Sequence, residues 1–509
     1  MATDIIAQGL AANAQTIATQ GTTSIRRGIP ISAANRVGGL GGVGATNVTD
    51  GTVSGATYRM LHKVPATVGF CDIQFVYGNW NWQATGEVAG ANAITVKAYL
   101  EYNGTSYPMY FNGAQTVTIQ PGVTVTTDIL PITLPAGASF WTRTYVTNNG
   151  VGSGTWPLGP ITNATSASTD TNNYNTAGGD VASSTGNIGS GGAAYSFDAI
   201  NIIGVPTAAT KSVGIVGDSI AAGNSDSGAL TIYYGPIERA LGQNVPWTRM
   251  TRSSYKSAYV GGVYSRSMSL FARGTVSAII AELGINDIPS QTLASFQALK
   301  ISEWTMLGAR GARIWQTTIT PQTTSTDNWT TLANQTIFNT GYNTIRISFN
   351  NWLRAGAPIV AGVAVSVGTS GALVAGQTGH PLTGYIEFAD AVESARDSGL
   401  YAVATNARVV TDAAISASSA TLTSATAAFT NADVGVSVYV AGAGTSGAAL
   451  STWILSVTNS TTAVLFSNAS TTVSGASLKI GGLTLDGLHP NSAGNLKASA
   501  VFTAALPNL

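Results

Sequence analysis

The sequence predicts an α/β fold with a parallel sheet, preceded by an antiparallel β domain and interrupted by a small β module. Three observations lead to this prediction. From about residue 208 the chain alternates between short apolar strands and longer helical stretches, a rhythm typical of a parallel sheet with helices on both faces. Residues 51–147 contain short strands separated by Gly and Pro, which is typical of an antiparallel β domain. Residues 407–480 repeat that β pattern within the α/β region.

Composition narrows the classes of function. With 509 residues the chain is long enough for two to four domains. Only 9% of its residues are charged, against roughly 25% in typical soluble domains. The formal net charge is +0 and no run of Lys or Arg is present, which argues against a nucleic-acid partner. No apolar stretch approaches the roughly 18 residues that span a bilayer, so we expect no membrane insertion.

Residues 1–50 show no sustained period and are expected to form an N-terminal arm, either a poorly packed leader or a docking segment. The start, Met1 to Ile5, has neither a basic region nor a continuous apolar run, so no signal peptide is visible. Low charge and strands rich in Thr, Ser and Gly lead us to expect an extracellular or virion-associated protein, such as a phage tail component.

The β domain is expected over residues 51–207, as an antiparallel β-sandwich or jelly roll. Apolar and polar residues alternate from Ile94 to Glu101, which indicates a half-buried strand. Asn103 and Gly104 then predict a tight turn, and Tyr107 to Phe111 can return as the partner strand. Residues 148–195 are polar with almost no apolar period and are expected to form a long polar loop.

Two tryptophans of this domain have two interpretations, and its cysteine has one. Trp80 and Trp82 share one face of a strand, where they either pack in the core or form a platform that stacks on a sugar. Cys71, the single cysteine, lies in an alternating run and is expected to pack in the core. No Cys and His residues have the spacing of metal ligands, so no metal is expected.

The α/β domain is expected over residues 208–406 and 481–509, with residues 407–480 as an inserted β module. Its strand and helix candidates follow one another in alternation. The strands are Ser212 to Gly217, Trp247 to Thr251, Ser277 to Leu283 and Ala312 to Thr318, and the helices are 229–242, 291–309 and 331–353.

The most informative fragment is Gly217-Asp218-Ser219-Ile220, which follows the apolar run Val213 to Val216. It places a serine at the carboxyl end of a strand, where open α/β sheets carry their chemistry. A serine hydroxyl becomes a good nucleophile only when a base removes its proton. Ser219 is therefore a candidate nucleophile that needs a histidine.

The candidate base is His489. Of the three histidines, His62 lies in the β domain and His380 lies in a loop without a nearby carboxylate in sequence. Only His489 has an acid three residues earlier, Asp486, which can hold the imidazole in one tautomer. Asn286, in Gly284-Ile285-Asn286-Asp287 after a buried strand, can donate a side-chain N–H to an oxyanion, as can the backbone of Ser219.

In this order and spacing the fragments around Ser219, Asn286 and Asp486–His489 resemble the SGNH (GDSL-type) hydrolase family. The resemblance implies a flavodoxin-like three-layer parallel sheet and a metal-independent esterase with no cofactor. It also implies a third oxyanion donor, a glycine N–H, from the loop after the second strand. Ser254 stands where that glycine is expected, and Gly261 or Gly262 is the alternative. The β domain is similar to the sandwich that precedes some bacterial members.

Many SGNH hydrolases remove O-acetyl groups from polysaccharides. We therefore expect a serine esterase that removes O-acetyl groups from an extracellular or cell-surface polysaccharide, with an acetylated glycan as its partner. Assembly into a homo-oligomer or a virion stays open. A catalytically silent receptor-binding or structural tail protein is the alternative from another class. A lipase or thioesterase of the same family is a further alternative, although no long apolar flap for a lipase follows Ser219.

Overall fold

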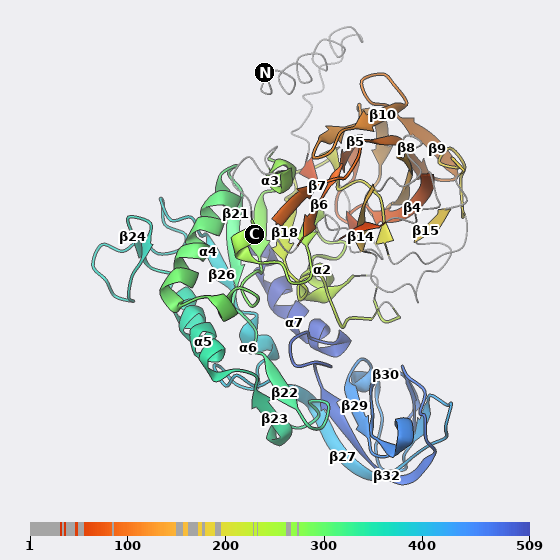
Figure 1. Cartoon of the computed structure of the whole chain (residues 1–509), viewed down its shortest axis with the longest axis vertical. Coiled ribbons are helices and arrows are strands. Elements are labelled where there is room, and N and C mark those ends of the chain that lie inside the picture. Colours follow the sequence, from red (N-terminus) through yellow and green to blue (C-terminus); the bar gives the residue numbers. More distant parts are fainter. Residues whose placement is uncertain are drawn as a thin grey trace.

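In the computed structural model, three structural parts are described: a β domain, an α/β domain and a closed barrel (Figure 1). The residues described are 31–32, 35–36, 46–48, 55–83, 86–148, 156–160, 172–175, 179–188, 195–227, 229–231, 233–260, 266–271 and 274–509. Of the predicted N-terminal arm, only three short strands are therefore described. They are β1 (Ile31–Ser32), β2 (Asn35–Arg36) and β3 (Thr46–Val48), and each pairs with a strand of the β domain.

Two antiparallel sheets share one apolar core in the β domain. The first sheet contains β1, β17 (Asn201–Pro206), β5 (Phe70–Gly78), β11 (Thr124–Thr126) and β12 (Leu130–Leu134). The second contains β2, β10 (Thr116–Ile119), β8 (Ile94–Tyr102), β9 (Thr105–Met109), β13 (Ser139–Thr147), β4 (Gly55–Lys63) and β15 (Asn172–Asn175). Smaller pairings join β6 (Trp80–Gln83) to β7 (Gly86–Ala89), and β14 (Trp156–Pro160) to β3 and β16 (Tyr195–Ser196).

The hairpin predicted at Asn103 and Gly104 is confirmed. Tyr102 pairs with Thr105, and the two turn residues have φ values of 49° and 69°. A two-residue turn with both φ values positive matches the twist of the strands that it joins.

The prediction of a long loop over residues 148–195 is wrong in part, because β14 and β15 lie within it. A further piece of it is held by Arg143, whose guanidinium donates to the carbonyl oxygens of Val181 (3.0 Å) and Ala182 (3.0 Å). Glu101 accepts the N–H of Gly186 at 2.9 Å. Polar groups hold this piece together with a few buried apolar residues that show no regular spacing, so apolar periodicity did not reveal it.

The α/β domain contains a parallel sheet in the order β19-β18-β20-β21-β26. In chain order these strands are β18 (Val213–Gly217), β19 (Trp247–Thr251), β20 (Ala278–Ala281), β21 (Arg313–Thr317) and β26 (Gly384–Ile386). The first four were predicted within a few residues of these bounds. Its described helices are α2 (Gly235–Leu241), α3 (Arg266–Phe271), α4 (Leu293–Gly308), α5 (Thr340–Arg354), α6 (Ala389–Val392) and α7 (Ser492–Ala505).

The two faces of this sheet pack against different helices. Along β20, Ile279 and Ala281 join the core that contains α3, α4 and α5 side chains, whereas Ala278 and Ile280 join the core that contains α2, α6 and α7 side chains. Successive side chains of a strand point to opposite faces, so the sheet is covered by helices on both.

Two predicted helices begin later than expected. Residues 332–337 form a 3₁₀ turn (Leu332–Asn334) and strand β23 (Gln335–Ile337), which pairs with β22 (Thr323–Ser325). Helix α5 starts only after Asn339, whose side chain accepts the N–H of Tyr342 as an N-cap. Helix α2 likewise starts at Gly235, with Pro236 in its first turn. The short hairpin of β24 (Ile359–Val360) and β25 (Val363–Ala364) was not predicted.

The predicted β module forms a closed barrel of strands, drawn in blue in Figure 1. In barrel order these are β27 (Val403–Ile415), β28 (Thr421–Thr423), β31 (Thr462–Leu465), β30 (Leu450–Asn459), β29 (Ser437–Val440) and β32 (Val473–Gly482). Its first and last strands extend a few residues beyond the predicted bounds of 407–480. No helix in the described part of the chain is long and apolar enough to cross a membrane.

Candidate active site

Ser219, His489 and Asp486 form a continuous chain of contacts at the carboxyl end of β18. The Nε2 atom of His489 lies 2.8 Å from Ser219 Oγ, and its Nδ1 atom lies 2.6 Å from Asp486 Oδ2. The fold thus brings together the three residues that the sequence predicted as nucleophile, base and orienting acid. Ser219 is the second residue after β18, and the other two lie on the loop between β32 and α7.

Hydrogen bonds within and around this loop hold Asp486 and His489 in place. The second oxygen of Asp486, Oδ1, accepts the N–H groups of Leu488 (2.9 Å) and His489 (2.8 Å). The hydroxyl of Thr484 donates to the His489 carbonyl (2.7 Å), and the buried Tyr401 hydroxyl donates to the Leu488 carbonyl (2.5 Å). Burial favours the neutral form of Asp486, but the hydrogen bond and charge of His489 outweigh it and lower the pKa of this carboxyl.

Gly487 allows the loop to turn between the acid and the base. Its φ is +76°, and a Cβ atom there would lie 2.0 Å from the Thr323 carbonyl oxygen. The Thr323 N–H in turn donates to the Gly487 carbonyl at 2.9 Å. Only glycine fits this position, because both the backbone angle and the close neighbour exclude a side chain.

Two buried carboxyl groups lie behind Ser219. Asp218 Oδ1 accepts the N–H of Ile220 (2.9 Å), and the N–H of Asp218 donates to Glu282 Oε2 (3.1 Å). Burial raises the pKa of Asp218 to about 6, although the N–H of Ile220 and the charge of His489 oppose the shift. Burial and the charge of Asp218 raise the pKa of Glu282 well above its usual range.

The predicted oxyanion donors differ in whether their N–H groups already have a hydrogen-bond partner. The backbone N–H groups of Ser219 and Ser254 have no hydrogen-bond partner in the described part of the chain. Ser254 has a φ of 63°, the backbone angle that favours the glycine expected there. The Asn286 amide is already engaged, because its Nδ2 donates to Asp218 Oδ2 (2.9 Å) and to the Tyr255 carbonyl (3.2 Å). Gly261 and Gly262, the alternatives to Ser254, lie outside the described residues.

The β domain packs against the loop that carries Ser254. The sequence did not predict this contact between the two domains. Trp82 stacks on Tyr255 with ring centroids 3.9 Å apart and an angle of 1° between the rings. Trp80 and Trp82 are 1% and 0% exposed, so they pack and cannot form a sugar-stacking platform. Further along the same loop, Asp287 accepts the N–H of Ser257 at 2.9 Å. The one sequence signal for this contact was the presence of two large aromatics on a short strand.

The other two histidines are structural. His62 is buried in the β domain, and its Nε2 lies 3.1 Å from Thr142 Oγ1 and 3.2 Å from Asp198 Oδ2. Nε2 of His380 lies 2.9 Å from the Ala357 carbonyl, and Nδ1 accepts the N–H of Leu382 at 3.0 Å. Cys71 is half-buried, with its Sγ 3.6 Å from the Val205 carbonyl. Among the described residues, no three His, Cys, Asp or Glu side chains gather as metal ligands would.

No protein-family model matches the chain, and no curated protein matches it. Among solved structures, its neighbours are GDSL- or SGNH-type acylhydrolases and esterases, in line with the resemblance of the sequence. One is a GDSL-like lipase from Bacteroides thetaiotaomicron, with 9% identity and a TM-score of 0.27 over 58% of this chain and 88% of that one. Another is a carbohydrate esterase of family 3 from Talaromyces cellulolyticus, with 10% identity and a TM-score of 0.27 over 59% and 97%. A third is a peptidoglycan O-acetylesterase, with 9% identity and a TM-score of 0.21 over 69% and 75%. These scores are low, so the contacts around Ser219 decide what the site can do.

Proposed function

We propose that the chain is a serine esterase in which Ser219 is the nucleophile, His489 the general base and Asp486 the group that orients His489. The observation that carries this proposal is the chain of contacts from Ser219 Oγ through His489 to Asp486, at 2.8 Å and 2.6 Å. A histidine between a hydroxyl and a carboxylate is the arrangement that activates serine for acyl transfer.

The reaction follows from this geometry. Ser219 Oγ attacks the ester carbonyl carbon while its proton passes to His489 Nε2, and the carbonyl oxygen becomes an oxyanion. The tetrahedral intermediate collapses as His489 returns the proton to the departing alkoxide, which leaves as an alcohol. Water then attacks the acyl-serine with His489 again as base, releasing the acid and free Ser219.

We assign the oxyanion site to the backbone N–H groups of Ser219 and Ser254, which have no partner within the described residues. Asn286 joins them when its amide gives up the longer of its two bonds, the 3.2 Å contact to Tyr255. The bond to Asp218 would then hold the amide in orientation while the freed N–H meets the developing charge.

We also assign the domains as the sequence predicts them. When the strands of the parallel sheet are numbered by their place in the chain, they lie side by side in the order 2-1-3-4-5. This order supports a flavodoxin-like three-layer domain over 208–406 and 481–509. Two antiparallel sheets on one core support a β-sandwich over 51–207. The closed barrel supports an inserted module over about 407–480.

For the substrate we propose the O-acetyl group of an extracellular or cell-surface polysaccharide, acted on by a virion-associated or secreted protein. The low charge of the chain and its many Thr, Ser and Asn residues support this choice over a charged partner. The alternatives are a lipase or thioesterase, and a silent receptor-binding protein. Assembly into an oligomer or a tail is part of the same proposal.

Hydrolysis of p-nitrophenyl acetate tests the reaction. We expect Ser219→Ala and His489→Ala each to lower kcat by at least about 1,000-fold, because nucleophile and base act as one unit. Ser474→Ala, the same change at an exposed serine of the barrel, is the control and should leave kcat unchanged. Equal turnover by wild type and Ser219→Ala would contradict the assignment. No turnover by wild type on any ester would favour the silent receptor-binding protein.

A further inference from the structure

A buried lysine, Lys300 of α4, contacts the two loops that carry the candidate oxyanion donors. Its Nζ donates to the Leu283 carbonyl (2.8 Å), to Ser257 Oγ (3.2 Å) and to Glu303 Oε2 (2.5 Å). An ammonium group has three N–H donors, so these three bonds use all of them. Lys300 and Glu303 are each 0% exposed, so neither side chain is open to solvent or to a substrate.

Two of the three acceptors belong to those loops, and only Glu303 belongs to α4. Leu283 is the second residue after β20 and precedes Asn286 on the same loop. Ser257 lies on the other loop, where it begins a 3₁₀ turn shortly after Ser254. The ammonium of Lys300 therefore joins both loops to one helix.

Other bonds join the same two loops. Asp287 accepts the N–H of Ser257 at 2.9 Å, and Asn286 Nδ2 donates to the Tyr255 carbonyl at 3.2 Å. In the proposed reaction Asn286 gives up its bond to Tyr255 in order to meet the oxyanion. Of these bonds, those made by Asp287 and Lys300 then remain to keep the spacing of the loops.

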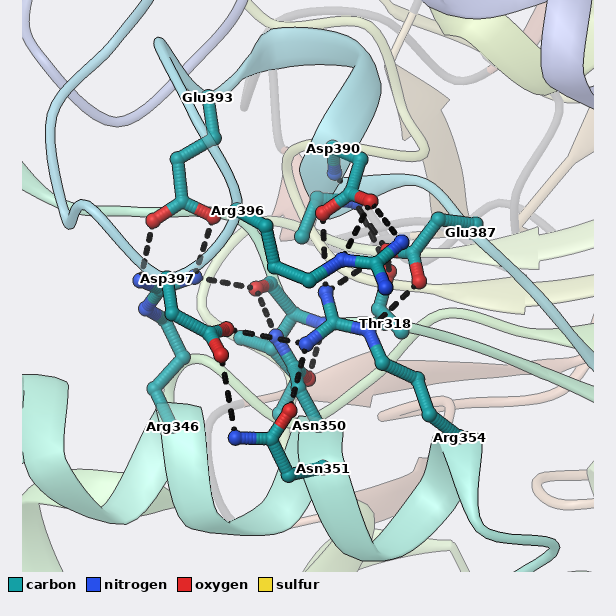
Figure 2. Close-up of polar contacts among 12 residues, drawn as sticks. Thr318, Arg346, Asn350, Asn351, Arg354, Glu387, Asp390, Glu393, Arg396 and Asp397 are labelled. Carbon is teal, nitrogen blue, oxygen red and sulfur yellow. Dashed lines mark hydrogen bonds and ion pairs between the residues drawn. The ribbon is translucent and has the colours of Figure 1, made fainter.

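Arg354 at the end of α5 is a cation of the same domain with a different set of partners (Figure 2). Its guanidinium is paired with the carboxylates of Glu387, Asp390 and Asp397. None of these three residues lies on the loops of the candidate oxyanion donors. Loss of Arg354 would thus break a cation–carboxylate cluster without removing a bond to either loop, which makes it a matched comparison for Lys300.

We propose that Lys300 is a positioning residue for the reaction, whose ammonium fixes the spacing of the loops of Asn286 and Ser254. The inference rests on the proposed esterase function. The bond between Asn286 and Tyr255 holds the loops in the resting enzyme and is lost only as charge develops on the oxyanion. Lys300 therefore matters more in the transition state than in the substrate complex, and its loss should lower kcat with little change in KM.

Hydrolysis of p-nitrophenyl acetate by Lys300→Met tests the proposal. Because this change leaves the buried Glu303 without its cation, the double variant Lys300→Met/Glu303→Leu is measured beside it. Replacement of a buried ion pair by apolar side chains of similar size is often neutral for stability. We expect kcat to fall about 10-fold in both variants, with KM within about 2-fold of wild type. The control Arg354→Met should leave kcat unchanged, at a temperature where unfolding curves show every variant to be folded.

Combination of Lys300→Met with Asn286→Ala separates positioning from stability. If Lys300 acts through the Asn286 amide, its loss should cost less once that amide is absent. The combined loss of kcat should then fall short of the product of the two single losses. Ser257→Ala removes one acceptor but keeps the ion pair, and it should lower kcat about 3-fold, the effect of one hydrogen bond. This milder change decides the matter if both lysine variants fail to fold.

The opposite outcomes would overturn the role of Lys300 and leave the esterase intact. They are an unchanged kcat in the folded Lys300 variants or in Ser257→Ala, an equal loss in Arg354→Met, a change confined to KM, and a full product of losses in the combination with Asn286→Ala. A wild type that hydrolyses no ester would instead overturn the proposed function, and the role of Lys300 with it.

Discussion

Asn286 contributes to the site through two bonds with different consequences. The 2.9 Å bond to Asp218 fixes the amide, and the 3.2 Å bond to Tyr255 uses its other N–H. An oxyanion must compete with that second bond. We therefore expect Asn286→Ala to lower kcat for p-nitrophenyl acetate by about 100-fold, the lower end of the usual cost of one oxyanion donor. KM should change much less, since the charge develops only in the transition state. A change confined to KM would show that Asn286 only contacts substrate.

Sequence alone could place Ser219, His489 and Asp486, because each chemical type is rare or follows a strong strand pattern. The sequence was less informative about the oxyanion donors. The unusual backbone of Ser254 is visible only as a φ of 63°, and the competition for the Asn286 amide depends on Tyr255, a neighbour distant in sequence. Side-chain partners of this kind are set by tertiary packing.

Glu282 gives the protein a pH-dependent stability. Its folded-state pKa is raised by burial and by Asp218, so the folded protein keeps a proton that the unfolded chain loses above about pH 4.5. Stability should therefore fall as pH rises above the unfolded pKa and through the folded one. Glu282→Gln resembles the neutral acid and can still accept the Asp218 N–H.

We expect this variant to match wild type near pH 4.5 and to become progressively more stable than wild type as pH rises. Chemical denaturation across that range measures the difference in unfolding free energy. The prediction concerns how this difference in unfolding free energy changes with pH, and not its value at any one pH. Parallel curves for the two proteins would show that Glu282 has no shifted pKa.

At the scale of elements, strands with clear alternation were predicted well, and elements that depend on distant partners were not. The hairpin of β8 and β9 carries both its alternation and its turn residues in the sequence. Helix α5 was predicted too early because residues 331–339 suit a helix, but pairing of β23 with β22 and the Asn339 cap override that preference. Strands β14 and β15 depend on partners far along the chain, which local periodicity does not contain.

The hairpin of β6 and β7 connects the β domain to the candidate oxyanion loop through the Trp82–Tyr255 stack. We expect Trp82→Leu to lower kcat for p-nitrophenyl acetate by about 10-fold, because Tyr255 loses its stacking partner and the neighbouring Ser254 N–H is less firmly placed. Trp80→Leu is the matched control. It removes an equally buried tryptophan of the same strand, which bonds instead to Thr124 at 2.9 Å. It should destabilise the fold similarly and spare kcat. Equal losses of kcat in Trp82→Leu and Trp80→Leu would show that the loss comes from general destabilisation of the fold.

At the scale of the whole molecule, the site depends on an interrupted domain. Ser219 and His489 are separated by 270 positions, and the barrel lies between α6 and the loop that carries His489. Figure 1 shows the barrel beside the end of α7 and away from the β domain. The barrel is in direct contact with the loop that carries Asp486 and His489. Ser437 of β29 donates to the Thr484 carbonyl at 3.0 Å and accepts from the Asn491 amide at 2.8 Å.

These contacts place the barrel behind Thr484 and Asn491, the residues at either end of the segment that holds Asp486 and His489. Removing the Ser437 hydroxyl leaves the buried Asn491 amide with one bond fewer and frees the Thr484 carbonyl, so the loop should sample more positions. We expect Ser437→Ala to lower kcat for p-nitrophenyl acetate about 3- to 10-fold with KM little changed.

Deletion of residues 407–480 should lower kcat further than Ser437→Ala does, even when circular dichroism shows that the remainder is folded. The exposed change Ser474→Ala on β32 should have no effect. Full activity in both Ser437→Ala and the folded deletion would mean that the loop holds its geometry without the barrel, through Tyr401 and Thr323 alone.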